Sequence, residues 1–227
     1  MGERITFPSN GHTCPGYLAT PEGGRGPGVV VIQEWWGLVP HIEDVCDRLA
    51  AEGFTALAAD LFHGETTTEP DEAAKKMMEL RIDEAGRDLS GAVTWLLGSE
   101  HTTGDGVGTV GFCMGGGLAL YLASLRPEVR ACVVYYGVAP WPEAQPDLSR
   151  IRAAVLGHFA ENDHFAGHEA VDPLEQRLRE AGVEAEFHWY PGTDHAFFND
   201  TRPEVHDAEA AQRSWALTVA FLHRHLG

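Results

Sequence analysis

The sequence contains few basic residues for its length. Sixteen lysines and arginines stand against 34 aspartates and glutamates, so the formal net charge of the 227 residues is −18 at pH 7. Nucleic acids and anionic membranes bind to basic surfaces, and this charge balance therefore argues against both as partners. The acidic residues are spread along the whole chain, which is typical of a solvated protein surface.

Long apolar segments are also missing, and cysteines are few. No hydrophobic run approaches the roughly 20 residues of a membrane-spanning helix, and residues 1–4 lack the apolar core of a signal peptide. The four cysteines form no Cys-x-x-Cys pair, so neither a disulfide framework nor a redox motif is expected. These absences predict a reduced, cytoplasmic protein without a membrane anchor.

The residues that are present suit one globular domain. Hydrophobic residues make up 44% of the chain, which is enough for a sizeable core. Apolar runs typical of buried parallel strands alternate with segments of helical period, and no linker or repeat interrupts them. We therefore predict a single α/β domain over residues 1–227, with a mostly parallel central sheet flanked by helices on both faces.

The alternation assigns each segment to a strand, a helix or a loop. The long segment 137–150 contains three prolines and is expected to be a loop. The predicted strands cover residues 4–7, 14–19, 28–32, 54–58, 107–110, 129–136, 153–159 and 183–190. The predicted helices cover residues 42–51, 71–80, 83–97, 118–125, 168–181 and 204–225.

The most informative segment is the Gly-x-Cys-x-Gly pattern around Cys113. It follows an apolar, β-branched run and precedes helix-forming residues, as in a nucleophile elbow that carries cysteine in place of serine. Such a turn would present the sulfur to a helix N-terminus, where unpaired amides favour a thiolate or an oxyanion. A buried cysteine at a glycine-packed strand–helix crossing would show the same pattern, so its partners must decide.

Two later loops carry those partners, Asp163 and His195. Each loop follows a predicted strand, at the sheet edge where ligands of open α/β sheets bind. The chain order of nucleophile, acid and histidine is that of α/β-hydrolases. His195 can serve as the base that a weakly ionised thiol needs and later as the acid, while Asp163 orients the ring. The sequence therefore predicts a triad of Cys113, Asp163 and His195.

An oxyanion hole requires two backbone amides. We expect one from Met114, directly after the nucleophile, and the other from Trp35, in the loop after an early strand. Glu34 in the same loop could compete with an anion there, or it could form a salt bridge or sit at a helix entry. Aromatic residues of the sheet-end loops are expected to line an apolar pocket, namely Trp35, Trp36, Phe62, Phe165, Phe197 and Phe198.

Five segments resemble the dienelactone hydrolase family of the α/β-hydrolase fold, over nearly the whole chain. The resemblance implies that Cys113, Asp163 and His195 form the triad and that Glu34 meets the resting thiol until substrate displaces it. It also implies hydrolysis of an enol-lactone, 4-carboxymethylenebut-2-en-4-olide. The five segments are Gln33-Glu34-Trp35-Trp36-Gly37, Gly111-Phe112-Cys113-Met114-Gly115-Gly116, Tyr135-Tyr136-Gly137, Asn162-Asp163-His164-Phe165 and Tyr190-Pro191-Gly192-Thr193-Asp194-His195-Ala196-Phe197.

The sequence departs from the family at the carboxylate-binding arginines. Members acting on dienelactone carry one arginine four residues after the catalytic histidine, where this chain has Asn199, which cannot replace the charge. The second arginine comes from the helical segment before the elbow, which here offers Lys75, Lys76 and Arg81. A neutral ester, lactone or thioester therefore stays open as the substrate. The residues predicted to bind substrate are Trp36, Arg81, Phe197 and Asn199.

The remaining expectations concern cofactors, partners and a rival function. No cofactor is expected, nor a metal, because His158, His164 and His168 match no known ligand spacing. The expected partner is a small lactone or ester, and the expected state is a monomer or weak homodimer. The chain could instead be a non-catalytic protein in which oxidation of Cys113 is sensed. The intact acid and histidine loops argue against that alternative.

Overall fold

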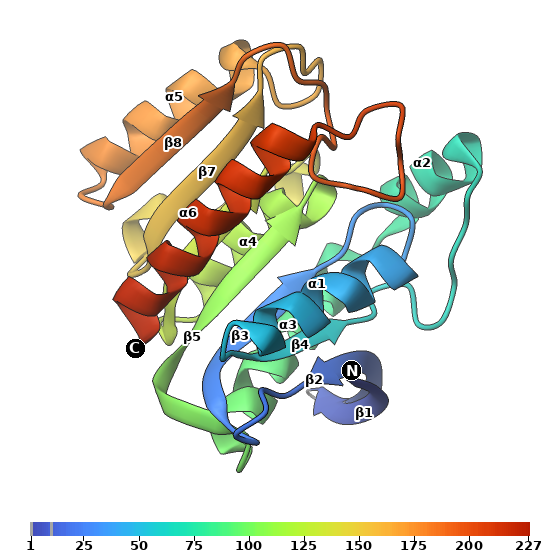
Figure 1. Cartoon of the computed structure of the whole chain (residues 1–227), viewed down its shortest axis with the longest axis vertical. Coiled ribbons are helices and arrows are strands. Elements are labelled where there is room, and N and C mark those ends of the chain that lie inside the picture. The colour runs from blue at the N-terminus through green and yellow to red at the C-terminus, as the bar shows by residue number, and fades with distance from the viewer. Residues whose placement is uncertain (1, 10) are drawn as a thin grey trace.

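The computed structural model describes residues 2–9 and 11–227, and these form an α/β fold around one central sheet (Figure 1). Within them, eight strands lie in the order β1-β2-β4-β3-β5-β6-β7-β8. The first two strands form an antiparallel hairpin against β4, and every later pairing is parallel. The strands are β1 Glu3–Ser9, β2 His12–Ala19, β3 Gly26–Ile32, β4 Thr55–Ala59, β5 Thr102–Phe112, β6 Val129–Tyr135, β7 Ala154–Ala160 and β8 Ala185–Tyr190.

Helices cover both faces of the sheet. Buried residues of α1 and α6 share one core layer, and those of α3, α4 and α5 share the other. This arrangement confirms the predicted α/β-hydrolase architecture. Every helix of the described residues is too short or too polar to span a bilayer. The helices are α1 Pro40–Ala51, α2 Pro70–Glu79, α3 Ile82–Gly98, α4 Met114–Leu125, α5 His168–Glu180 and α6 Ala208–Leu226.

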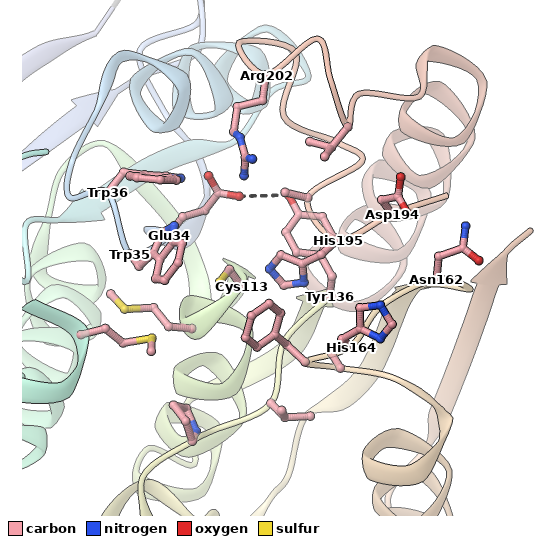
Figure 2. Close-up of a pocket in the computed structure, with 18 residues that line it drawn as sticks. Glu34, Trp35, Trp36, Cys113, Tyr136, Asn162, His164, Asp194, His195 and Arg202 are labelled. Carbon is pink, nitrogen blue, oxygen red and sulfur yellow. Dashed lines mark hydrogen bonds between the residues drawn. The ribbon is translucent and has the colours of Figure 1, made fainter. Parts of the chain in front are cut away.

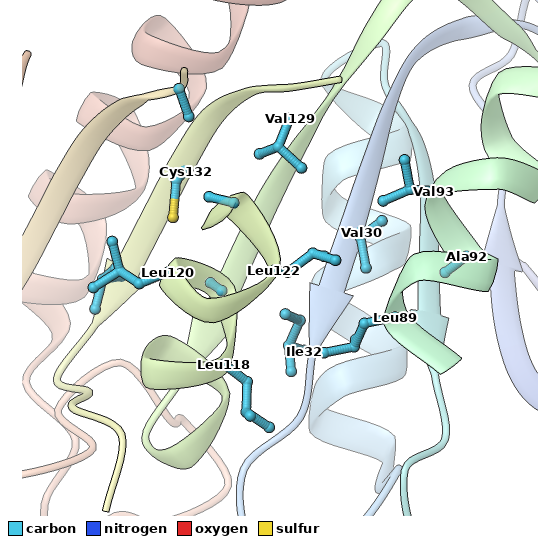
Figure 3. Close-up of a cluster of buried hydrophobic side chains, with 14 of the residues drawn as sticks. Val30, Ile32, Leu89, Ala92, Val93, Leu118, Leu120, Leu122, Val129 and Cys132 are labelled. Carbon is cyan, nitrogen blue, oxygen red and sulfur yellow. The ribbon is translucent and has the colours of Figure 1, made fainter. Parts of the chain in front are cut away.

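The apolar runs of the parallel strands are explained by burial on both sides. In β3, Val30 and Ile32 face the layer of α3 and α4, shown in Figure 3, while Val29 and Val31 face α1 and α6. A strand between two helical layers has no solvent-facing side, so its sequence loses the alternation of a half-exposed strand. Burying each such side chain stabilises the fold by roughly 1.5–3 kcal/mol.

The last helix begins four residues later than predicted. The sequence suggested a start at residue 204, whereas α6 starts at Ala208 because Asp207 adopts an extended backbone and caps it. The Asp207 carboxylate accepts a 2.8 Å hydrogen bond from the Ala210 N–H, which satisfies one of the free amides at the helix N-terminus. The segment between β8 and α6 therefore runs as a chain of turns beside the carboxyl ends of the strands.

A core substitution tests the two-layer packing. We expect Leu96→Ala in α3 to lower the free energy of unfolding by about 2–5 kcal/mol, because Leu96 is fully buried and the change leaves a cavity. The measurement is urea denaturation followed by circular dichroism. Met78→Ala is the matched control, since Met78 is 66% exposed and should change stability by about 0.5 kcal/mol or less. Equal losses in the two variants would contradict the assignment of Leu96 to the core.

Candidate active site

The Cys113 turn joins β5 directly to α4 and has a strained backbone. Cys113 adopts φ 54° and ψ −121°, a region that non-glycine residues rarely occupy and that is associated with functional sites. The flanking glycines are needed for close packing: a Cβ at Gly111 would collide with the carbonyl of Gly115, and one at Gly115 with that of Ile32. The structure thus has the elbow geometry that the sequence pattern predicts.

The two residues expected to supply oxyanion-hole amides, Trp35 and Met114, both line the cavity described below. The Cys113 N–H is already used, because it donates to the Tyr135 carbonyl at 3.0 Å. The Met114 N–H begins α4 and therefore has no partner within the helix. Trp35 lies in the loop after β3, and both Trp35 and Met114 line the same cavity as Cys113. Their placement is compatible with the predicted oxyanion hole.

The acid and the histidine come from neighbouring parallel strands. β7 and β8 pair up to Ala160 and Tyr190, and the loops that follow them carry Asp163 and His195. The two side chains form a 2.7 Å hydrogen bond between Asp163 Oδ2 and His195 Nδ1. Asp163 is buried, and its other oxygen accepts the N–H groups of Phe165 and Ala166 at 2.7 and 3.0 Å. The loop itself therefore fixes the carboxylate that orients His195.

The His195 ring also lies beside Cys113 (Figure 2). Burial alone would lower the pKa of His195, but its interactions with Asp163 and Cys113 outweigh burial and raise the pKa to about 10. Burial would likewise raise the pKa of Asp163, yet hydrogen bonding to His195 and to two backbone amides lowers it. The raised pKa of His195 and the lowered pKa of Asp163 both favour an imidazolium next to an ionised carboxylate. In this charge state His195 can hold the proton that a thiol gives up when it becomes a thiolate.

Glu34 lies on the cavity wall with two neutral donors. Its Oε1 accepts the Tyr136 hydroxyl at 3.3 Å, the dashed line in Figure 2, and its Oε2 accepts the Asn199 amide at 2.8 Å. The resemblance implied that Glu34 meets the resting thiol. The hydrogen bonds that the described residues give Glu34 go to Tyr136 and Asn199, and the contact with the resting thiol stays a prediction.

The cavity has a volume of about 400 Å³ and a largely apolar wall. Trp36 lines it, as predicted from the sequence, and Phe165 at its edge is 70% exposed. Such a cavity can hold a small ring compound against the sulfur of Cys113. The lining residues are Glu34, Trp35, Trp36, Met77, Cys113, Met114, Tyr136, Val138, Pro140, Asn162, His164, Phe165, Ala166, Asp194, His195, Ala196, Arg202 and Val205.

Three residues predicted to bind substrate do not line this cavity. Phe197 is fully buried and packs its ring against Tyr136 and Tyr190. Asn199 is also buried, and its amide points at Glu34. Arg81 is 65% exposed on a different surface and forms ion pairs with acidic neighbours in α3. The family resemblance suggested these residues, but the turns after β8 and the start of α3 direct their side chains elsewhere.

The sequence-based prediction missed Arg202, which does line the cavity. Its guanidinium lies 5.6 Å from the ring centre of Trp36, and its Nε pairs with Glu204 at 2.9 Å. Figure 2 shows Arg202 on the same side of the cavity as Glu34 and Trp36. The only available signal was a basic residue shortly after the histidine loop, in a segment that the helical pattern did not resolve.

The three histidines considered as metal ligands lie in three different environments. His158 is buried, with its two ring nitrogens hydrogen-bonded to the Tyr190 and Thr218 hydroxyls at 2.9 and 3.0 Å. His168 pairs with the exposed Asp172, and His164 lines the cavity. They form no common ligand set among the described residues.

Known proteins resemble this chain along its whole length. A sequence model of the dienelactone hydrolase family matches residues 14–226. "Protein usf" of Aquifex pyrophilus is 37% identical, and the "Putative carboxymethylenebutenolidase" of Aquifex aeolicus is 36% identical; each alignment covers 100% of both chains. The crystal structure of a "Putative Dienelactone Hydrolase" from Klebsiella pneumoniae has a TM-score of 0.89 at 28% identity and covers 99% of each chain.

The Asp163–His195 pair makes stability depend on pH in two directions. The pKa of His195 is raised from 6.5 to about 10, so its contribution is full below about pH 6.5 and is lost as pH rises through about 10. The pKa of Asp163 is lowered from 3.8, so its contribution is lost as pH falls below that value. We expect His195→Gln to cost most stability near pH 5 and least near pH 10, measured by urea denaturation.

A histidine outside the site serves as the control for this pH dependence. His168→Gln removes an exposed ring that pairs with an exposed carboxylate, and exposed pairs contribute about 0–1 kcal/mol. Its effect on stability should therefore be small at every pH. A His195→Gln penalty that stays constant from about pH 5 to about pH 10 would contradict the charged pair.

Proposed function

This chain belongs to the dienelactone hydrolase family, and we propose that it hydrolyses a small lactone or ester through an acyl-cysteine on Cys113. The family and the names of the relatives indicate a hydrolase that acts on ester bonds. The observation that carries the finer proposal is the 2.7 Å Asp163–His195 hydrogen bond, with the ring beside Cys113 in one cavity.

Acylation begins from the Cys113 thiolate beside protonated His195, the ion pair formed when the thiol proton has passed to His195. The sulfur then bonds to the carbonyl carbon of the substrate, and the carbonyl oxygen becomes an oxyanion held by the Trp35 and Met114 amides. When the oxyanion collapses, the carbon–oxygen bond of the ester or ring breaks, and His195 returns its proton to the leaving oxygen. An enol leaving group departs as a ketone, which suits a thiol nucleophile.

Deacylation repeats these steps with water. His195 accepts a proton from water while the water oxygen bonds to the acyl carbon, and the same two amides hold the second oxyanion. The carbon–sulfur bond then breaks and leaves a carboxylic acid and Cys113 as a thiolate beside protonated His195. Asp163 stabilises the imidazolium in both half-reactions, because its carboxylate stays ionised and fixed by backbone amides.

We propose Arg202 as the group that receives a substrate carboxylate. The sequence places uncharged Asn199 at the family's arginine position, but Arg202 lies three residues further along and lines the cavity. A guanidinium can form charge-assisted, bidentate hydrogen bonds with a carboxylate. This placement supports 4-carboxymethylenebut-2-en-4-olide, or a lactone of similar charge, as the substrate.

A second candidate substrate is a neutral ester or thioester. The observation that favours it is the Arg202–Glu204 ion pair, because Glu204 offsets part of the charge of Arg202. The apolar wall of the cavity would also accept an uncharged acyl group. Both substrates use the same nucleophile and the same acyl-cysteine, so they differ only in what Arg202 contributes.

Removing the nucleophile tests the mechanism. Cys113→Ala should lower kcat by about 10⁴-fold or more, because no other group can form the acyl intermediate. Ultraviolet-monitored hydrolysis of cis- and trans-dienelactone, beside a p-nitrophenyl ester, measures the loss. Cys132→Ala is the matched control, since Cys132 is a free cysteine buried in β6. Full activity in Cys113→Ala would rule out the acyl-cysteine.

Mass spectrometry after brief exposure to the ester separates catalysis from redox sensing. An acyl adduct on Cys113 is expected for the hydrolase. A sensor would instead show only oxidised sulfur after peroxide treatment and no adduct after exposure to the ester.

Replacing Arg202 separates the two substrate classes. If Arg202 binds a carboxylate, Arg202→Gln should raise KM for dienelactone by about 10–100-fold, the equivalent of one charge-assisted interaction, and should leave p-nitrophenyl ester hydrolysis nearly unchanged. Arg81→Gln is the control, because Arg81 is exposed and does not line the cavity. Equal losses on both substrates, or none on dienelactone, would contradict carboxylate binding by Arg202.

A further inference from the structure

A second cluster of titratable side chains lies outside the cavity of Cys113. His12 begins β2, His63 lies in the turn after β4, and Asp88 lies in α3. Each offers one ligand atom, and the three atoms all lie within 4.8 Å of one another. None of these residues lines the cavity of Cys113, so the proposed hydrolysis leaves the cluster unexplained.

Asp88 is the buried centre of this cluster. Its Oδ1 accepts the Ser9 hydroxyl at 2.6 Å and faces His12 Nε2 at 2.7 Å. Its Oδ2 is also buried, yet it accepts no hydrogen bond from any residue that the structure describes. His63 Nε2 lies 3.2 Å from that oxygen, without the geometry of a hydrogen bond. Because this buried oxygen has an imidazole nearby but no hydrogen bond, its burial is poorly compensated, which points to a missing ligand.

The backbone holds the three side chains in place. The β1–β2 hairpin approaches α3 so closely that a Cβ on Gly91 would lie 2.9 Å from Ser9. On the other side, the Asp60 carboxylate accepts the Phe62 and Gly64 N–H groups at 3.1 and 2.7 Å. This tight turn gives His63 a φ of 51°. Three segments held by close packing and hydrogen bonds thus converge on one point, as a preorganised ligand site requires.

We infer that His12, His63 and Asp88 bind a divalent transition-metal ion, with Zn²⁺ as the representative ion. Two imidazoles and one carboxylate are a ligand set that Zn²⁺ accepts, with bonds of about 2.0–2.2 Å. Bonds of that length place tetrahedral ligand atoms about 3.3 Å apart. His12 Nε2 lies 2.7 Å from Asp88 Oδ1 and His63 Nε2 lies 3.2 Å from Asp88 Oδ2, and all three ligand atoms lie within 4.8 Å of one another, so side-chain rotations can bring them to this spacing.

The site would leave one coordination position toward solvent. The side chains of His12 and His63 are 39% and 44% exposed, whereas that of Asp88 is 1% exposed. His63 and Asp88 also line an adjacent cavity of about 360 Å³, through which an ion can enter. Each imidazole would coordinate through Nε2 and keep its proton on Nδ1, so neutral histidines are required. A bound ion would then link the hairpin, the turn and α3.

Cys14 also lies in this region, but its thiol donates to the backbone carbonyls of Pro15 and Asp60 at 3.2 and 3.9 Å. It is not one of the three residues whose ligand atoms lie within 4.8 Å of one another. The expected first coordination shell therefore contains nitrogen and oxygen atoms and no sulfur.

The test measures zinc binding to the full chain in a Cys113→Ala background. This background is needed because the thiol and imidazole of the active site could also bind zinc. Titration of Zn²⁺ against a chromophoric chelator should show one ion per chain. Both His12→Ala and His63→Asn should weaken the affinity by at least about tenfold, the lower end of what even an outer-shell change costs. Asparagine tolerates the positive φ of residue 63.

His168→Ala provides the matched control. His168 is another exposed histidine 3.0 Å from a carboxylate, but the described part of the chain offers no third ligand beside it. The His168→Ala substitution should therefore leave the zinc affinity unchanged.

Cobalt substitution gives an independent readout, because nitrogen and oxygen ligands produce visible bands without thiolate-to-metal charge transfer. Zinc should also raise the thermal midpoint of the Cys113→Ala protein by about 5 °C or more at 100 times its Kd.

Two results would overturn this site. One is the absence of stoichiometric zinc binding in Cys113→Ala, and the other is unchanged affinity in His12→Ala and His63→Asn. The two histidine variants decide the question even if Asp88→Asn fails to fold, because His12 and His63 are exposed. Neither result depends on ester hydrolysis, so the metal site and the proposed hydrolase stand or fall separately.

Discussion

The backbone turn at Cys113 is the constraint on which the rest of the candidate site depends. A positive φ at a non-glycine residue persists only where the surroundings hold it, and here β5 and α4 hold it from both sides. The Cys113 N–H donates to the Tyr135 carbonyl, and the Cys113 carbonyl accepts the Gly116 N–H at 2.9 Å. The close approach of Gly115 to β3 then places the Trp35 loop beside the sulfur.

Sheet topology supplies the remaining groups without long connections. Parallel strands end at one edge, so the loops after β3, β5, β7 and β8 open on the same side of the molecule. Pairing of β7 with β8 places the Asp163 and His195 loops next to each other. Backbone amides then fix Asp163, while neutral side chains fix Glu34. The geometry of the site is therefore largely inherited from strand order and register.

Local patterns were enough to predict the strand–helix alternation, the elbow and the three residues, Cys113, Asp163 and His195, that the structure brings together. Each of these depends on a few neighbouring residues or on the end of a strand. Arg202 and Asn199 depend instead on the path of residues 199–206, where the Asn199 N–H donates to the Ala196 carbonyl and turns the chain. The cluster of His12, His63 and Asp88 joins segments far apart in sequence, and no local spacing could reveal it.

The buried carboxylate of Glu34 has a consequence for turnover. The proposed deacylation would leave a carboxylate in a cavity whose wall already carries that of Glu34. Two like charges in a partly dehydrated space repel each other more strongly than they would in water. The chain's excess of acidic residues extends this repulsion beyond the cavity mouth. This repulsion opposes the attraction of Arg202 and protonated His195 for the released acid, and it should weaken as added salt screens the charges.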